Sequence, residues 1–283
     1  MNKSKIEWLD GGYTWNPVTG CLHNCEYCYA RKQARRFSGC YDMNSDENII
    51  QSEKGKVSLE HNGQVLFKTK KNKLMRAPYP FGFVPTFHRY RLDEPQGIKK
   101  PQNVFVCSMA DLFGEWVPDW WIKQVFEATQ KAPQHNYIYL TKNPDFYYRL
   151  NDGDEKIIPD GGVSGFFGAS ASTEGQAQSA YENLNCQWIS IEPIQGEFSE
   201  EFFWYEDRYI QDCMPRWKWV IIGAETGNRK GKVIPKREWI ENIVSECREQ
   251  NVPVFLKDSL IDIVGEKQMV REFPWQRGEI KDK

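Results

Sequence analysis

Short apolar runs that alternate with helical segments constrain the fold of this 283-residue chain more than any other feature. Each run has about five residues, mostly β-branched or aromatic, and such continuous runs suit strands that are buried on both faces of a parallel sheet. The runs occupy residues 13–19, 84–88, 104–109, 137–141, 166–170, 188–192, 219–223 and 252–257. Their pattern predicts an α/β fold.

The segments between these runs are predicted to form crossover helices. Residues 118–131 begin with Pro118, which is favoured in a first helical turn, and repeat apolar residues at helical spacing. Further helices are predicted at residues 26–37, 177–184 and 236–250. About seven or eight strand–helix steps predict a (β/α) barrel, complete or partial, that forms a single domain over residues 1–283. An open doubly wound sheet is the alternative, although no glycine-rich dinucleotide fingerprint follows an early run.

A basic insertion at residues 38–80 follows the first strand–helix step, and it includes a predicted hairpin near residues 65–69. From Glu53 to Lys100 the chain has 11 Lys/Arg against 4 Asp/Glu, a balance of +7, so the rest of a chain of net charge −2 carries −9. One interpretation is a solvated surface; the other is a contact with nucleic-acid phosphates. The densest basic residues are Lys68, Lys70, Lys71, Lys73 and Arg76.

The absence of long apolar segments bears on the cellular compartment. No run approaches the roughly 18 residues that span a bilayer, and the N-terminal segment lacks the apolar stretch of a secretion signal. We therefore expect a cytoplasmic protein with no membrane partner, in a compartment where thiols stay reduced. The 8 cysteines are then better interpreted as free thiols or metal ligands than as a disulfide framework.

Three cysteines, Cys21, Cys25 and Cys28, lie within the segment C-L-H-N-C-E-Y-C. Thiolates at this spacing can bind one iron–sulfur cluster. Three protein ligands leave one iron of a [4Fe–4S] cluster open, and an open metal position is where a cosubstrate binds. A structural zinc site with His23 or Cys40 as fourth ligand is one alternative, although zinc sites usually pair cysteines with two residues between them. Three unligated cysteines in a loop are the other alternative.

The spacing, with an aromatic residue before the third cysteine, resembles the C-x3-C-x-aromatic-C motif of the radical S-adenosylmethionine superfamily. This resemblance implies a full or partial (β/α) barrel in which the cluster loop follows the first strand. It implies that Cys21, Cys25 and Cys28 bind a [4Fe–4S] cluster, that S-adenosylmethionine is the cosubstrate, and that Tyr27 lies beside its adenine. It also implies a flavodoxin- or ferredoxin-type electron donor as protein partner.

A closer resemblance extends over much of residues 1–258. It is carried by the segments IEWLDGGYTWNPVTGC, FVCSMADLFGEWVP, APQHNYIYLTKNP, ISIEPIQG, VIIGAETG and VPVFLKD. These segments resemble a phage-associated family of radical-SAM-like proteins whose reaction is unassigned. Together with the basic insertion, this resemblance favours a nucleobase in DNA or RNA as substrate, with a peptide or small molecule as the runner-up.

Polar residues follow most of the predicted strands. In a (β/α) barrel such residues face the active site, although loop residues would be polar in any case. The predicted cofactor-binding residues at these positions are Ser108, Thr141, Ser170, Glu192, Glu225 and Lys257, with Asp111 and Lys142 as neighbours.

The superfamily often has a Gly-Gly-Glu segment after its second strand that holds the methionine amino group. The nearest likeness here is Gly223-Ala224-Glu225, which lies late in the chain, so Glu225 has two alternative roles: it binds substrate, or it pairs with Lys257.

The sequence thus predicts an enzyme that cleaves S-adenosylmethionine to a 5′-deoxyadenosyl radical. The alternative is a non-catalytic protein, stabilised by an iron–sulfur cluster or by zinc, that binds nucleic acid or serves as an adaptor.

Overall fold

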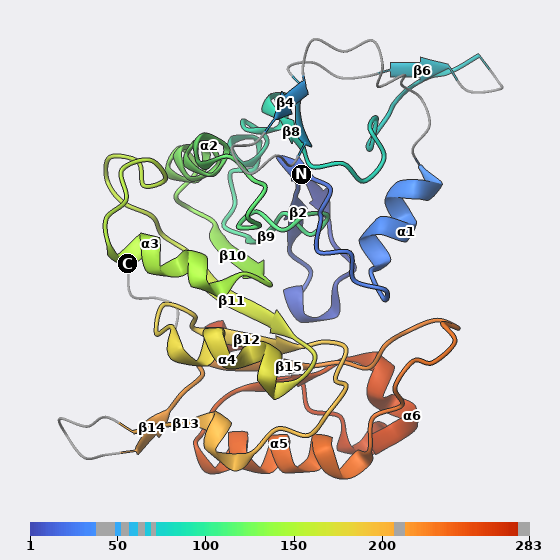
Figure 1. Ribbon diagram of the computed structural model, residues 1–283, viewed down its shortest axis with the longest axis vertical. Helices are drawn as coiled ribbons and strands as arrows, with labels where there is room; N and C mark the ends of the chain where they lie inside the picture. Colours follow the sequence, from blue (N-terminus) through green and yellow to red (C-terminus); the bar gives the residue numbers. More distant parts are fainter. Residues whose placement is uncertain (38–48, 52–56, 62–65, 69–71, 207–212, 277–283) are drawn as a thin grey trace. The chain divides into compact units, whose positions relative to one another are not determined.

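The computed structural model describes the residues 1–37, 49–51, 57–61, 66–68, 72–206 and 213–276. Their course is shown in Figure 1. The chain divides into two compact units, each with its own strands and helices, which confirms the predicted α/β class. Unit 1 comprises Met1–Ser4, Gly11–Asn143 and Asp152–Gly165, and unit 2 comprises Lys5–Asp10, Pro144–Asn151 and Phe166–Lys283. A single barrel domain over the whole chain stays a prediction.

Unit 1 contains three parallel strands in the order β2, β9, β10, with β1 antiparallel to β2. The strands are β1 (Asn2–Lys3), β2 (Tyr13–Trp15), β9 (Asn103–Val106) and β10 (Asn136–Thr141). Helix α2 (Asp119–Gln130) connects β9 to β10 and follows Pro118, as the sequence predicts. Its buried face includes Trp121, Val125 and Phe126, at the spacing of a helix packed on one side.

A second, smaller sheet in unit 1 corrects the prediction for residues 84–88. Its strands lie in the order β3 (Val18–Thr19), β8 (Thr86–His88), β5 (Val57–His61), β4 (Ile49–Gln51). The expected second strand of the parallel sheet is therefore β8, antiparallel to β3, and β9 is the parallel neighbour of β2. All three residues of β8 are buried, and burial alone does not identify a strand's partner.

The insertion at residues 38–80 contains the predicted hairpin, formed by β6 (Leu66–Lys68) and the antiparallel β7 (Leu74–Arg76). Of the five basic residues predicted to contact phosphates, Lys70 and Lys71 lie outside the described residues. Lys68 and Arg76 are the last residues of β6 and β7, and Lys73 is exposed between the strands. The nucleic-acid contact expected there stays a prediction.

Unit 2 contains four parallel strands in the order β11 (Phe166–Ala171), β12 (Trp188–Ile191), β15 (Trp219–Ile222), β16 (Val254–Leu256). Every residue of β12, β15 and β16 is buried, which confirms strands covered on both faces. The paired row that ends these strands is Ala171, Ile191, Ile222 and Leu256. Helix α4 (Glu174–Glu182) follows β11, and α5 (Arg237–Glu249) follows β15, close to their predicted positions.

The remaining elements are short. Helix α1 (Tyr29–Arg36) belongs to unit 1. Unit 2 also contains α3 (Tyr148–Asn151), α6 (Ile261–Val264) and a hairpin of β13 (Trp204–Glu206) with β14 (Cys213–Pro215). In the described part of the chain, no helix has the length and hydrophobicity needed to cross a membrane.

Tryptophan packing fills the core of unit 2. The ring centroids of Trp8, Trp188 and Trp219 lie between 5.5 and 6.0 Å apart, and all three side chains are buried. A Cβ atom on Gly168 would lie 2.2 Å from the Trp188 ring, so the strand needs glycine there. Part of the chain's aromatic content, 14% of its residues, therefore serves packing.

Candidate functional site

The loop that bears the three predicted ligands lies in unit 1, between β3 and α1. Its start is fixed by backbone hydrogen bonds from Gly20 N to Met109 O (2.9 Å) and from Cys21 N to Phe83 O (3.3 Å). Gly20 has φ +87°, and a Cβ atom there would lie 2.2 Å from the carbonyl oxygen of Val84. Only glycine allows the chain to enter the loop this close to neighbouring backbone.

Cys21, Cys25 and Cys28 are free thiols, each half-buried. Burial is the main cause that raises the pKa of Cys21 to about 12, followed by the negative charge of Asp111 and then by Cys25 and Cys28. Among the described residues, no group of three or more His, Cys, Asp or Glu side chains has the arrangement needed to hold a metal ion. The donor set itself fits an iron–sulfur cluster, because three accessible soft sulfur donors on one loop are the ligands that such clusters take.

Asp111 connects this loop to the ends of two strands. The residue is 5% exposed. Oδ1 accepts hydrogen bonds from Phe113 N (3.1 Å) and Thr141 Oγ1 (2.7 Å). Oδ2 accepts from Lys142 N (2.8 Å) and lies 2.7 Å from His23 Nε2. One buried side chain thus joins the cysteine loop, the segment after β9 and the end of β10.

Asn16, directly after β2, connects the end of that strand to the segment after β9, a contact that was not predicted. Its Oδ1 accepts hydrogen bonds from Met109 N (2.9 Å) and Ser108 Oγ (3.2 Å). Tyr29, at the start of α1, donates its hydroxyl to Ser108 O (2.8 Å). The predicted first strand ran over residues 13–19 and included Asn16, whereas β2 ends at Trp15, so the sequence did not mark Asn16 as a strand-end residue.

Tyr27 of the cysteine loop lies next to Lys142, which directly follows β10. Lys142 Nζ is 3.2 Å from the Tyr27 hydroxyl and 5.5 Å from the centre of its ring. Three of the predicted cofactor-binding residues, Tyr27, Ser108 and Thr141, therefore lie in unit 1, in the network around the cysteine loop.

The other four predicted residues belong to unit 2. Glu192, Gly223 and Lys257 each lie one residue beyond the last paired row of β12, β15 and β16. Lys257 Nζ donates to the Glu192 carboxylate, and both side chains are partly exposed. Gly223 lies between them in the sheet, and a Cβ atom there would be 3.0 Å from Lys257 Cδ and 3.2 Å from Glu192 Cγ. The missing side chain leaves room for the ion pair.

Glu225 has a different partner from the one considered in the sequence analysis. Its buried carboxylate pairs with Arg229 through Nε–Oε1 (2.7 Å) and Nη2–Oε2 (2.8 Å), so the alternative pairing with Lys257 is wrong. Glycine and alanine before Glu225 thus lead into a loop closed by an i,i+4 ion pair. Ser170 lies within β11, half-buried, opposite Ser190 of β12.

Replacing Gly223 with alanine should lower the free energy of unfolding by about 1 kcal/mol, because the added methyl group crowds the Lys257–Glu192 pair. Gly175→Ala is the matched control: nothing lies within 4 Å of its Cβ position on α4, so it should raise stability by up to about 1 kcal/mol. Denaturant unfolding of both variants measures the difference. Equal effects of the two substitutions would contradict the crowding argument.

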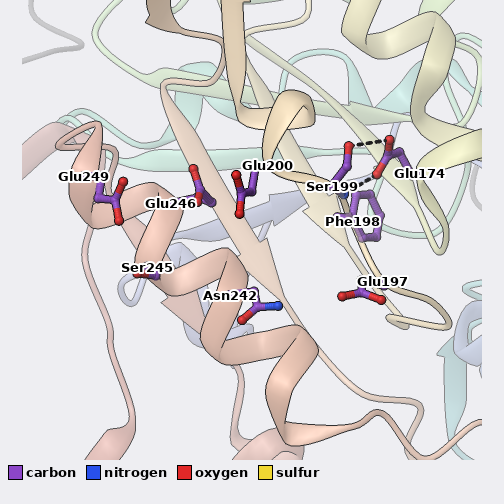
Figure 2. Close-up of a pocket in the computed structure, with 9 residues that line it drawn as sticks. All are labelled: Glu174, Glu197, Phe198, Ser199, Glu200, Asn242, Ser245, Glu246 and Glu249. Atoms are coloured by element: carbon purple, nitrogen blue, oxygen red, sulfur yellow. Dashed lines mark hydrogen bonds between the residues drawn. The ribbon is translucent and has the colours of Figure 1, made fainter.

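An acidic pocket of about 680 Å³ lies in unit 2, next to α5 (Figure 2). Its lining includes five glutamates: Glu174, Glu197, Glu200, Glu246 and Glu249. Glu174 accepts a hydrogen bond from Ser199 Oγ (2.8 Å), and Glu246 Oε2 accepts from Trp204 Nε1 (3.2 Å). Five carboxylates repel a phosphate backbone, so this pocket does not suit a polyanion.

The comparisons with known proteins give one match. A family model described as a protein of unknown function, DUF5131, matches residues 3–271. The match includes the cysteine loop and all the strand-end residues described above. No curated protein and no solved structure matches the chain significantly.

Proposed function

We propose that this protein, which belongs to the DUF5131 family of proteins of unknown function, is a radical S-adenosylmethionine enzyme. The observation that carries the proposal is the set of three free, half-buried thiols, Cys21, Cys25 and Cys28, on one loop. A [4Fe–4S] cluster held there would supply an electron for reductive cleavage of the sulfonium and yield a 5′-deoxyadenosyl radical. The electron comes from a flavodoxin- or ferredoxin-type donor.

The protein's own groups have distinct parts in this proposal. Cys28 Sγ accepts a hydrogen bond from Arg31 N (3.3 Å), which fixes this sulfur at the start of α1. Tyr27 offers a ring for the adenine of the cosubstrate, and Lys142 keeps that ring in place through its hydroxyl. Asp111 holds the loop through His23 against the end of β10. Asn16 fixes Met109 after β9, and the Met109 carbonyl oxygen in turn accepts from Gly20 N at the start of the loop.

The proposal includes a (β/α) barrel, complete or partial, as the fold that surrounds the cluster. It is supported by parallel strands in each unit and by helices that follow β9, β11 and β15. Ser170, Glu192, Glu225 and Lys257 are proposed to bind cosubstrate or substrate from the ends of the unit 2 strands. A nucleobase in nucleic acid is the proposed substrate, with a peptide or small molecule as the alternative.

One contact favours the zinc alternative, in which the protein is not catalytic. His23 Nε2 is bound to Asp111, and a zinc-ligating histidine commonly has a carboxylate on its other ring nitrogen. His23 Nδ1 with the three thiols would then complete a four-ligand site. Metal analysis separates the two candidates: His23→Ala should abolish zinc binding at a Cys3His site, whereas a three-thiolate cluster should still form, with less iron retained because the loop loses its contact with Asp111.

Anaerobic reconstitution with iron and sulfide tests the enzyme proposal. Cys25→Ala should lose the bound iron and the formation of 5′-deoxyadenosine from S-adenosylmethionine, while far-ultraviolet circular dichroism keeps its wild-type form. The control is Cys186→Ala, a buried thiol of unit 2 outside the motif, which should retain iron. A fully loaded wild-type cluster that cleaves no cosubstrate after reduction would reject the proposal. Loss of the fold in Cys25→Ala would favour a structural metal.

A further inference from the structure

Helix α1 carries a strongly basic face directly beyond the cysteine loop. Its sequence, YARKQARR, contains four cationic residues and no acidic residue. The buried side of the helix is formed by Ala30 and Ala34, which pack against Tyr79 and Met109. The cationic residues are Arg31, Lys32, Arg35 and Arg36.

The spacing of these residues places the charges away from the packed side. At about 100° per residue, the cationic positions cover one continuous face, roughly opposite the stripe of Ala30 and Ala34. Lys32, Arg35 and Arg36 are exposed, and Arg31 is half-buried. An eight-residue helix is about 12 Å long, which matches three to four phosphates of a stacked nucleic-acid strand.

Aromatic rings lie at both ends of this face. Tyr29 is 57% exposed although its hydroxyl is bonded to Ser108 O, and Phe37 is 49% exposed beside the guanidinium of Arg36. Basic residues together with exposed rings are the combination by which proteins bind single strands, since every base can stack on a ring.

The helix is joined to the proposed cluster site by two contacts. Cys28 caps its first turn through Sγ, and the Arg31 guanidinium donates to Asn24 Oδ1 within the cysteine loop. A strand bound along α1 would therefore pass beside that loop.

We propose that the basic face of α1, formed by Arg31, Lys32, Arg35 and Arg36, binds the phosphates of a single-stranded nucleic acid and presents it to the Cys21–Cys28 loop. The assignment of this face as a substrate site rests on the proposed function. It places a nucleic-acid contact on a helix next to the thiols, and the contact predicted for the basic insertion stays a separate prediction.

The test measures fluorescence polarisation of a labelled 12-nucleotide single strand with the reconstituted full chain, without S-adenosylmethionine. Arg35→Glu/Arg36→Glu should weaken binding at least about tenfold at low salt and reduce the slope of log K against log salt by about 1.4, because two phosphate contacts are lost. Arg35→Gln/Arg36→Gln removes the charges without adding acid and should show a smaller loss.

Lys99→Glu/Lys100→Glu is the matched control, since both lysines are exposed on another loop of unit 1 and the change in net charge is the same. It should bind like the wild type. Equal weakening of the two double variants, or a wild type that does not bind, would overturn the proposal. A third outcome would also overturn it: Arg35→Glu/Arg36→Glu binds nucleic acid like the wild type, but its cluster is no longer reduced by an acidic flavodoxin. That result would assign the basic face to a protein electron donor.

The two proposals fail separately. A wild type that binds the strand through α1 but cleaves no S-adenosylmethionine would reject the enzyme and retain the surface. A wild type that cleaves the cosubstrate and does not bind the strand would reject the surface and retain the enzyme.

Discussion

Replacing Arg216 with alanine should lower the free energy of unfolding by about 3–4 kcal/mol, because it leaves several buried carbonyl groups without a donor. Arg216 is 6% exposed. It donates to the carbonyl oxygens of Tyr181 (2.7 Å), Cys186 (2.9 Å) and Asn183 (2.9 Å), and also to that of Ala180. These carbonyls belong to the last turn of α4 and the segment beyond it, so the guanidinium caps the helix from outside.

The side chain also contributes packing. Its guanidinium lies 4.0 Å from the centre of the Trp217 ring, and alanine would remove this contact with the hydrogen bonds. Arg237→Ala is the control: that arginine is about half exposed and pairs with Glu241 one turn further along α5, so stability should change by no more than about 0.5 kcal/mol. Denaturant unfolding monitored by tryptophan fluorescence compares the two. A loss below about 1 kcal/mol for Arg216→Ala would contradict the capping role.

Replacing Asp111 with asparagine should lower stability by about 2–3 kcal/mol and reduce the iron retained after reconstitution. Each carboxylate oxygen faces two donors, and an amide would turn one acceptor into a further donor. With the contact to His23 weakened, the cysteine loop would lose its link to Thr141 at the end of β10. Iron per chain and the visible absorption of the cluster report this loss independently of activity.

Asp93→Asn is the control for that substitution. Asp93 is exposed and accepts a hydrogen bond from Gln96 Nε2 (3.1 Å), so neither the stability nor the iron content should change measurably. Asp111→Asn protein with wild-type stability and full iron content would show that the carboxylate does not hold the loop.

The strands of unit 2 could be predicted closely because their signal is local. Continuous apolar runs such as WISI and WVII are buried along their whole length, and the sequence shows this directly. The run at 84–88 was also recognised as a strand, yet its place in the sheet was predicted wrongly. Pairing depends on residues far away in the chain, here β3 and β5, and a run of three buried residues carries no information on its partner.

In the candidate site, too, local features could be predicted and contacts between distant residues could not. The three thiols of Cys21, Cys25 and Cys28 were evident from their spacing, because residues within one short loop are kept close by covalent geometry. Glu225 and Lys257 were plausible partners from their positions alone, whereas the structure gives each a different partner, Arg229 and Glu192. A charged side chain pairs with whichever opposite charge the backbone brings within reach, and the backbone path between strands decides that.

The amino-acid order by itself determined the α/β class, most strand and helix positions, and the three-thiol loop, since each depends on residues near one another in the chain. Only the tertiary structure decided that Asp111 joins His23, Thr141 and Lys142, and that Gly223 leaves space between Glu192 and Lys257. These contacts bring together residues from separate strands, and their energies arise from burial and hydrogen bonding that exist only once the chain has folded.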